Sequence, residues 1–235
     1  MAEGPSTSLR ASRRLPALVI FDMAGTTVED RGQVPMTFKE TLARHGVMVT
    51  HEQITGIRCA SKREAIRSLL PPAHADRAER VYGEFRDALA QRYLREGVRS
   101  IPGADEAFAT LRKAGVKVAL STGFDRDIAD LLLSALGWTR NTVDIVVCGD
   151  DVSNGRPAPD MILLAMKRAG IDDASLVANL GDTALDLESA ARAGVKWNIG
   201  VLSGAHAREA LERAPHTHII QSIAALPWLI EPPAN

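Results

Sequence analysis

The sequence has few cysteines, few aromatic residues and no surplus of charge of one sign. Its two cysteines, Cys59 and Cys148, exclude a disulfide framework and are typical of a reducing cytoplasm. Aromatic residues make up 4% of the chain, and the three tryptophans show no spacing suited to a stacking platform. The formal net charge of −1 gives no field of one sign, which argues against nucleic acid or an anionic membrane as partner.

Long hydrophobic runs are also missing. No stretch is long enough to cross a bilayer, so we expect a cytoplasmic protein with no membrane partner. Arg10, Arg13 and Arg14 precede an apolar run, but that run is too short for the hydrophobic region of a signal peptide. Residues 1–16 are polar, and we expect a disordered tail there.

The first strongly patterned stretch is Leu18–Phe21, four apolar residues that predict a buried strand. The strand ends at Asp22, and Gly25 follows where the chain must turn sharply. Asp22 would therefore lie at the carboxyl end of a strand, where open α/β sheets bind their ligands. On this stretch alone, a solvated turn carboxylate is as good an interpretation as a nucleophile or a metal ligand.

Beyond that strand the pattern divides the chain into two parts. Residues 32–99 show helical signals and no strand signal, over a length too great for an ordinary connection, so we expect an inserted helical domain. Its expected helical stretches are 35–45, 54–70 and 75–96. The segments 17–31 and 100–235 alternate strands with helices, which predicts an α/β core with a parallel sheet covered on both faces. Near its end, Ser203 is interpreted as the N-cap of a helix over 205–213.

Polar groups follow several of the expected core elements. Asp22, Thr122 and Asp182 end strands, and Arg156 precedes Pro157, which is expected to open a helix. Because the carboxyl ends of parallel strands share one edge, these groups should meet there. Two carboxylates favour Mg²⁺, while a hydroxyl and a guanidinium suit the oxygens of a phosphoryl group. The residues therefore predict phosphoryl transfer with Asp22 as nucleophile.

The order of these motifs resembles the haloacid dehalogenase superfamily of hydrolases. The motifs are Asp-x-x-Gly-Thr from Asp22, the strand-ending Thr122, Arg156 before proline, and Gly-Asp-Thr-x-x-x-Asp ending at Asp186. The resemblance implies a Rossmann-like core with the helical insert as a cap over the site. It also implies that Asp22 attacks phosphorus to form an aspartyl-phosphate, while Thr122, Gly123 and Arg156 hold the phosphoryl group.

The same resemblance implies a Mg²⁺ site. Its ligands would be Asp22, the backbone carbonyl of Ala24 and Asp182, with Asp186 in or next to the metal shell. Most phosphatases of the superfamily carry a second Asp where Ala24 stands, and use it as general acid and base. Alanine can do neither, so the leaving group needs no acid or another residue supplies it.

The first motif, together with Gly-Arg-Pro, looks most like the phosphonatase family and its close relatives. In those enzymes a cap lysine forms a Schiff base with the substrate aldehyde. Lys62 is the matching lysine. Arg58 and Arg63 are near enough in sequence to depress its pKa, and Arg58 is expected to contact substrate. Cys59 and Ala65 stand where phosphonatases have glycine and histidine. The missing histidine makes the match closer to the phosphonatase-like hydrolases.

The favoured interpretation is a Mg²⁺-dependent phosphohydrolase of the phosphonatase-like type, with phosphonoacetaldehyde as the best single substrate. The alternative is a phosphomonoesterase that acts on a small sugar, alcohol or cyclitol phosphate without an imine. A haloacid dehalogenase and a non-catalytic binding protein are less favoured. The expected partner is a small phosphorylated or phosphonate substrate, and the resemblance implies a homodimer formed through the cap.

Overall fold

A parallel six-stranded sheet lies at the centre of the structure, a computed structural model that describes residues 15–56 and 61–226. Its strands are β1 (Leu18–Asp22), β2 (Lys117–Ser121), β3 (Ile145–Val147), β4 (Val177–Gly181), β5 (Trp197–Val201) and β6 (His218–Ile220). Their order is β3-β2-β1-β4-β5-β6, and neighbouring strands are parallel throughout. The strand order reverses between β1 and β4, which is where a sheet of this kind opens a crevice at its carboxyl edge.

Helices precede and follow these strands. Those before β2 are α1 (Gln33–Arg44), α2 (His51–Gly56), α3 (Lys62–Leu69), α4 (Ala78–Glu96) and α5 (Ala104–Lys113). Those after β2 are α6 (Arg126–Leu136), α7 (Asp160–Ala169), α8 (Ala184–Ala193) and α9 (Arg208–Glu212). The expected α/β core with a parallel sheet is therefore confirmed.

The central strand β1 is buried along its whole length. On one face Phe21 packs edge-on against Phe108 of α5, with ring centroids 5.2 Å apart. On the other face Leu18 and Ile20 pack in a cluster with Met161 of α7. Helices thus cover both faces of the strand, which explains why its sequence is a continuous apolar run rather than an alternating one.

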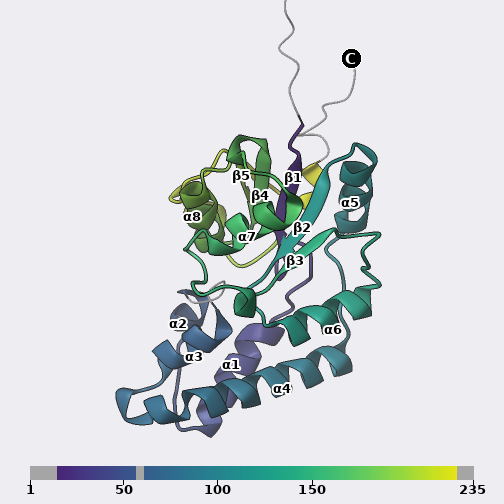
Figure 1. Ribbon diagram of the computed structural model, residues 1–235. Coiled ribbons are helices and arrows are strands. Elements are labelled where there is room, and N and C mark those ends of the chain that lie inside the picture. The colour runs from purple at the N-terminus through teal and green to yellow at the C-terminus, as the bar shows by residue number, and fades with distance from the viewer. Residues whose placement is uncertain (1–14, 57–60, 227–235) are drawn as a thin grey trace, which may run out of the picture.

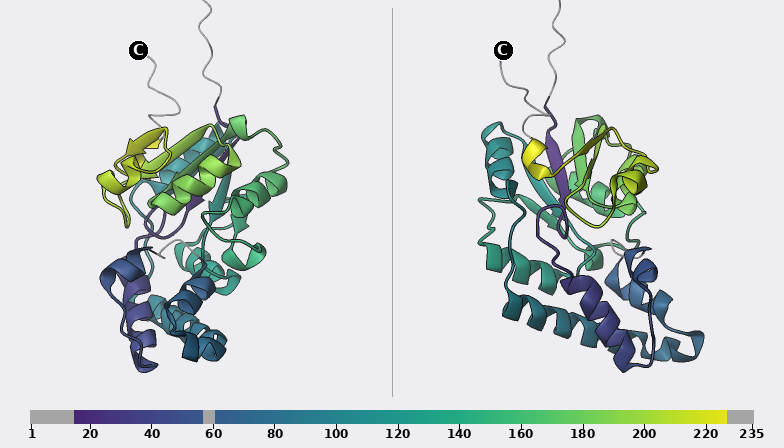
Figure 2. Two further views of the ribbon diagram at one scale, coloured as in Figure 1. Left: turned by 90° about the vertical axis from the view of Figure 1, so that its left-hand side faces the viewer. Right: turned by 180° about the vertical axis from the view of Figure 1, so that it is seen from behind.

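Helices α1–α4 form a separate helical group beside the carboxyl ends of the strands (Figure 1). The group has its own aromatic contact, Phe38 of α1 against Phe85 of α4, with centroids 4.2 Å apart. It is joined to the core surface by α4, where Arg86 Nε lies 3.1 Å from Asp127 Oδ2 of α6. The views from the side and from behind show the same separation of sheet and helical group (Figure 2).

The chain enters and leaves the helical group at one place. The backbone N–H of Glu29 donates to the carbonyl of Arg99 at 2.9 Å, and that of Ile101 donates to the carbonyl of Thr27 at 2.9 Å. The linker before α1 and the linker after α4 therefore run side by side in opposite directions, with an antiparallel bridge between Val28 and Ser100.

Several element boundaries differ from expectation. The helical stretch expected over 54–70 is divided into α2 and α3, and residues 57–60 between them lie outside the described part of the chain. The helix expected from residue 75 begins as a 3₁₀ turn over Pro72–Arg77. Pro157 does not begin a helix. Instead, α7 starts at Asp160, with Pro159 as its N-cap.

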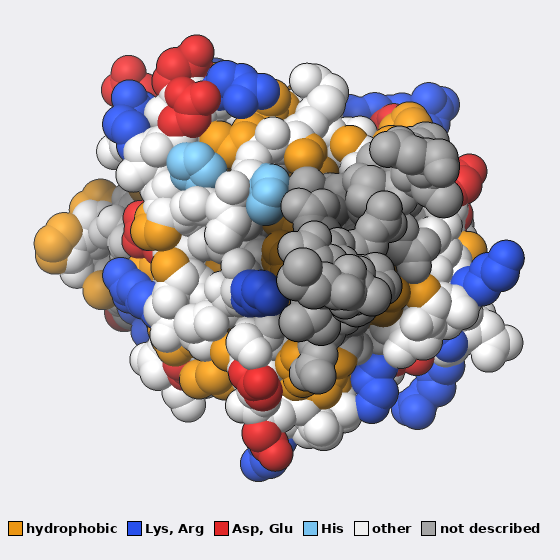
Figure 3. All heavy atoms as spheres, turned by 90° about the horizontal axis from the view of Figure 1, so that it is seen from above, with side chains coloured by type: hydrophobic (Ala, Val, Ile, Leu, Met, Phe, Trp, Pro, Cys, Tyr) orange, Lys and Arg blue, Asp and Glu red, His pale blue; other side chains and the backbone are white. Residues whose placement is uncertain are grey.

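The surface of the core at the end away from the helical group carries mixed side chains (Figure 3). Hydrophobic groups lie in small patches between acidic and basic ones, and neither sign of charge dominates this view. Within the residues the structure describes, no helix is long and apolar enough to cross a membrane.

Candidate active site

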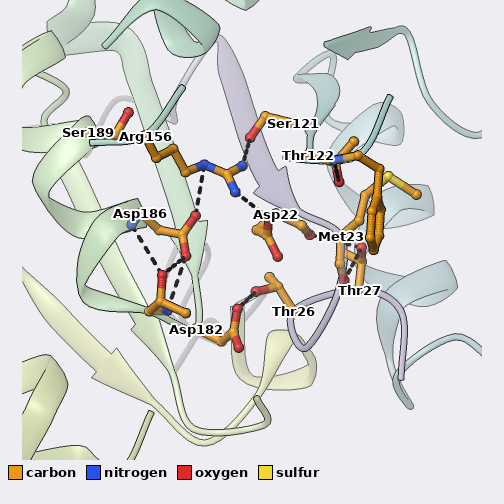
Figure 4. Close-up of polar contacts among 12 residues, drawn as sticks. Asp22, Met23, Thr26, Thr27, Ser121, Thr122, Arg156, Asp182, Asp186 and Ser189 are labelled. Atoms are coloured by element: carbon orange, nitrogen blue, oxygen red, sulfur yellow. Dashed lines mark hydrogen bonds and ion pairs between the residues drawn. The ribbon is translucent and has the colours of Figure 1, made fainter. Parts of the chain in front are cut away.

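Two carboxylates meet at the point where the strand order reverses. Asp22 is the last residue of β1, and Asp182 directly follows β4, which pairs with β1 so that Phe21 lies opposite Leu180. The side chains lie on the same edge of adjacent strands (Figure 4). This is the placement the sequence predicted for a shared ion.

Arg156 joins three of the site's side chains. Its Nη1 donates to Asp22 Oδ1 at 2.7 Å, its Nη2 to Ser121 Oγ at 2.7 Å, and its Nε lies 3.0 Å from Asp186 Oδ1. The guanidinium is held in a fixed plane by these contacts, since three directed bonds leave it little freedom. The loop between β3 and α7 thus places the buried guanidinium of Arg156 at the carboxyl end of β1.

The carboxyl group of Asp22 is buried in a low-dielectric environment. Burial raises the pKa of Asp22 from 3.8 to about 6, while Arg156 acts in the opposite direction and Asp186 adds to the rise. The Oδ2 atom of Asp22 is buried and has no hydrogen-bond partner within the described residues. A buried carboxylate oxygen without a partner is costly, so this atom is suited to a cation or a reacting group.

Asp182 is held by the loop that follows β5. The backbone N–H of Ala205 donates to its Oδ2 at 2.6 Å, and Thr26 Oγ1 donates to its Oδ1 at 3.4 Å. A Cβ on either Gly25 or Gly204 would overlap Asp182 Oδ2. Two glycines on different loops therefore leave the space that this carboxylate occupies.

The carboxylate of Asp186 is bonded to Thr183 and Arg156 in this structure. Its Oδ2 accepts from the N–H of Thr183 at 3.1 Å and from Thr183 Oγ1 at 2.6 Å, which makes a capping box at the start of α8. Its Oδ1 faces Arg156. Both oxygens are engaged, so the geometry favours a residue next to a metal shell over a direct ligand.

The residues present fit a magnesium ion with few protein ligands. Among the described residues, no group of three or more His, Cys, Asp and Glu side chains could enclose a metal. Mg²⁺ needs no such cage, because it usually takes one or two carboxylates and completes its shell with water and phosphate oxygens. The buried, unpartnered Asp22 Oδ2 next to Asp182 is the observation that matches this donor set.

A small pocket opens over Asp22. Its lining side chains include carboxylates, cations, a hydroxyl and apolar groups. They come from β1 and the linker that follows it, from α1 and α3, and from the loops after β2 and β3. Its lining residues are Asp22, Ala24, Asp30, Val34, Lys62, Thr122, Gly123, Phe124 and Arg156. Among the described residues, the pocket therefore brings together every predicted site residue except Asp182 and Asp186. Arg58 lies outside the described residues.

Lys62 comes to the pocket from the helical group. It is the first residue of α3 and only 5% exposed, and its Nζ lies 5.4 Å from the ring centroid of Phe124. Its backbone N–H donates to the carbonyl of Gly123 at 3.4 Å, so α3 is fastened to the loop after β2. On the core side Thr122 Oγ1 accepts from the N–H of Phe124 at 3.2 Å.

A larger hollow of about 670 Å³ lies at the β3 edge between α6 and α7. Its lining includes Arg126, Trp138 and Arg168 and none of the predicted site residues. We place the candidate active site in the smaller pocket, because the buried carboxylate of Asp22 and its partner Arg156 line it.

Sequence reasoning missed three contributors. Asp30 and Ser121 carry no motif, and each is recognised only because the fold brings it to the pocket or to Arg156. Ser203 was expected to cap a helix, but its Oγ donates to the carbonyl of Gly25 at 2.8 Å, and α9 begins five residues later with Ala207 as its N-cap. The loop after β5 thus ties the turn after β1 to Asp182.

Comparisons with known proteins agree on one family. A family model described as haloacid dehalogenase-like hydrolase matches residues 16–194. Phosphonoacetaldehyde hydrolase of Bacillus cereus (strain AH187) is 31% identical over 201 residues, covering 79% of this chain and 75% of that protein. Among solved structures, a hydrolase from Pseudomonas syringae superposes with a TM-score of 0.81 at 27% identity, over 93% of this chain and 100% of its own. A phosphonoacetaldehyde hydrolase like protein from Oleispira antarctica shares the fold, with a TM-score of 0.81 at 24% identity, over 93% and 92%.

Proposed function

Because the chain belongs to the haloacid dehalogenase-like hydrolase family and is a phosphohydrolase of that family, we propose that it cleaves a small phosphonate or phosphate ester through a phosphorylated Asp22 with the help of Mg²⁺. The observation that carries the proposal is the environment of Asp22. One carboxylate oxygen is bonded to Arg156 and the other is buried without a partner, at the floor of a pocket. A nucleophile needs this combination of orientation and an available oxygen.

Each residue of the pocket has a distinct role in the proposed reaction. Asp22 would attack phosphorus, and Thr122 with the backbone of Gly123 would contact the phosphoryl oxygens. Arg156 would stabilise the charge that develops on them, since it is fixed before the substrate arrives. Mg²⁺ held by Asp22, the Ala24 carbonyl and Asp182 would neutralise phosphoryl charge when bound. The helical group, as a cap, would close the pocket against water through α3.

Lys62 supports a phosphonate substrate as the first choice. An amine on the pocket wall can condense with an aldehyde, releasing water and forming an imine. When Asp22 then attacks phosphorus, the electrons of the C–P bond pass into the imine to give an enamine, and no acid is needed at the position of Ala24. Phosphonoacetaldehyde is the simplest substrate of this kind, and the Bacillus cereus relative is named for it.

A phosphate ester is the second choice, favoured by Ala65. This residue is buried in the apolar cluster of the helical group and offers no proton-transfer group near Lys62. An ester of a small sugar, alcohol or cyclitol would use Lys62 as a positive contact only.

Phosphate release over a panel of phosphonates and phosphate esters, with Mg²⁺ and with a chelator, tests the proposal. We expect turnover of at least one compound, loss in the chelator, and loss in Asp22→Asn but not in the exposed control Asp87→Asn. In a parallel assay with haloacids, halide release that survives the chelator would replace the proposal by dehalogenation. No turnover in any arm would favour a binding protein.

Borohydride reduction in the presence of phosphonoacetaldehyde separates the two substrate classes. A covalent adduct on Lys62, absent in Lys62→Arg, supports the imine route, because arginine keeps the charge and cannot form the imine. Phosphate release from an ester by an enzyme that gives no adduct supports the second choice.

A further inference from the structure

The pocket holds four ionisable side chains, and two of them cannot carry the proton of the reaction. Asp22 is the nucleophile, and the guanidinium of Arg156 stays protonated in proteins. Ala24, which stands where the general acid of related phosphatases would be, has a side chain that can neither donate nor accept a proton. Asp30 is then the carboxylate of the pocket that the proposed function leaves without a role.

The fold brings Asp30 back to the end of β1. After Asp22 the chain turns on itself: the N–H of Val28 donates to the carbonyl of Met23 at 2.7 Å, and the N–H of Gly25 donates to the carbonyl of Val28 at 2.8 Å. Residues 28–30 therefore run beside the start of the same loop before entering the linker to α1. A carboxylate eight positions after the nucleophile thus lines the same pocket.

The side chain of Asp30 is oriented by its own turn. Its Oδ1 accepts from the N–H of Gly32 at 2.9 Å, and the residue is half-buried. This bond sets the orientation of the carboxylate, and Asp30 lines the pocket. The first residues of the linker that leads to the cap therefore carry an acid into the reaction space.

We propose that Asp30 is the general acid and base of this site for phosphate esters, a proposal that rests on the function proposed above. As Asp22 Oδ2 forms its bond to phosphorus, the ester P–O bond breaks and its electron pair goes to the leaving oxygen. The Asp30 carboxyl gives that oxygen its proton, and the alcohol leaves. The Asp30 carboxylate then takes a proton from water, whose oxygen attacks phosphorus, and Asp22 is released with inorganic phosphate.

The test compares two leaving groups in Asp30→Asn. Asparagine keeps an oxygen for the N–H of Gly32, so the turn is preserved. Glu29→Gln is the matched control, because Glu29 is the adjacent residue, is also half-buried and does not line the pocket. The substrates are p-nitrophenyl phosphate, whose leaving group needs no proton at neutral pH, and glycerol phosphate, whose leaving group does. The readout is the rate of the first turnover and the phosphate trapped on the enzyme.

In Asp30→Asn we expect the first release of p-nitrophenolate to stay within about ten-fold of wild type, followed by slow turnover with phosphate trapped on Asp22. The first release of glycerol should fall by about 10²–10⁴-fold, the usual contribution of a positioned acid. Equal losses on both substrates with no trapped phosphate would mean that Asp30 only shapes the pocket, and would overturn the proposal, as would no loss on either. A wild-type enzyme in which neither these esters nor phosphonoacetaldehyde phosphorylates Asp22 would instead overturn the proposed function.

Discussion

The Nη1 atom of Arg156 lies 2.7 Å from Oδ1 of Asp22, and the two side chains are 3% and 5% exposed. Two residues 134 positions apart in sequence are thus joined in a nearly dry environment. The pairing fixes one oxygen of Asp22 and leaves the other facing the pocket.

The geometry of Arg156 predicts that lysine cannot replace it. One ammonium group cannot reach Asp22, Ser121 and Asp186 in the directions that the planar guanidinium uses. We expect Arg156→Lys to lower kcat/KM about 10- to 100-fold, the loss of charged hydrogen bonds worth about 1.5–3 kcal/mol. Arg168→Lys is the control, since Arg168 bonds the carbonyl of Val146 outside the pocket. Equal kinetics for wild type and Arg156→Lys would contradict this view of the site.

The raised pKa of Asp22 predicts a stability cost in the metal-free protein. The folded pKa of about 6 exceeds the usual 3.8, so the contribution of Asp22 to wild-type stability is most favourable below about pH 4 and is lost as the pH rises to about 6. With chelator at pH 7.5, Asp22→Asn should therefore be more stable than wild type, by on the order of 1–3 kcal/mol. The gain should vanish near pH 4 and shrink when Mg²⁺ is added to wild type. Denaturant melts at both pH values measure it, and a less stable variant at pH 7.5 would refute it.

The space beside Asp182 predicts a metal-affinity defect that does not depend on turnover. A Cβ at residue 204 would overlap the carboxylate of Asp182, so Gly204→Ala must move one of them. We expect Mg²⁺ affinity, measured by calorimetry, to fall about ten-fold or more. Gly83→Ala in α4 is the control, because a Cβ there meets nothing within 4 Å and alanine is the better helix former by about 1 kcal/mol. Unchanged affinity in Gly204→Ala would show that Asp182 holds no ion.

The environment of Cys148 predicts a thiol that does not react in the folded protein. Burial raises the pKa of the Cys148 thiol from 9.0 to about 12, which lowers its thiolate fraction on the order of 1,000-fold. In Cys59→Ser, modification by a thiol-specific disulfide reagent should be slower by about that factor than in the same protein unfolded in urea. Rapid labelling under native conditions would show that local unfolding at the carboxyl end of β3 readily exposes the thiol.

The positions of Asp22 and Asp182 could be predicted because each follows a short apolar run ended by a Gly-containing turn. Such strands, alternating with helices, allow essentially one parallel arrangement, and its carboxyl edge collects the residues that end the strands. Lys62 could be placed in the pocket only through the resemblance, since a lysine at a helix start is usually a surface residue. The structure shows it buried at the pocket wall, and its chemistry stays a prediction.

What could not be predicted depends on contacts between distant loops. The bond from Ser203 to the carbonyl of Gly25 spans 178 positions, and no local pattern distinguishes it from a helix cap. Ser121 precedes the predicted Thr122, yet its contact with Arg156 depends on how the loop before α7 approaches β2. Asp30 lies in a polar linker, where a carboxylate is unremarkable until the turn after β1 folds it back.

The two antiparallel linkers at Glu29 and Arg99 have a consequence for how such an enzyme can change. Their backbones are already hydrogen-bonded at the junction, so a different set of helices could be grafted between them without remaking the sheet. The helical group that covers the site could in this sense be exchanged as a unit. Asp30 lies at this junction and would remain with the sheet, so a graft would keep both the proposed proton-transfer group and the proposed nucleophile, Asp22.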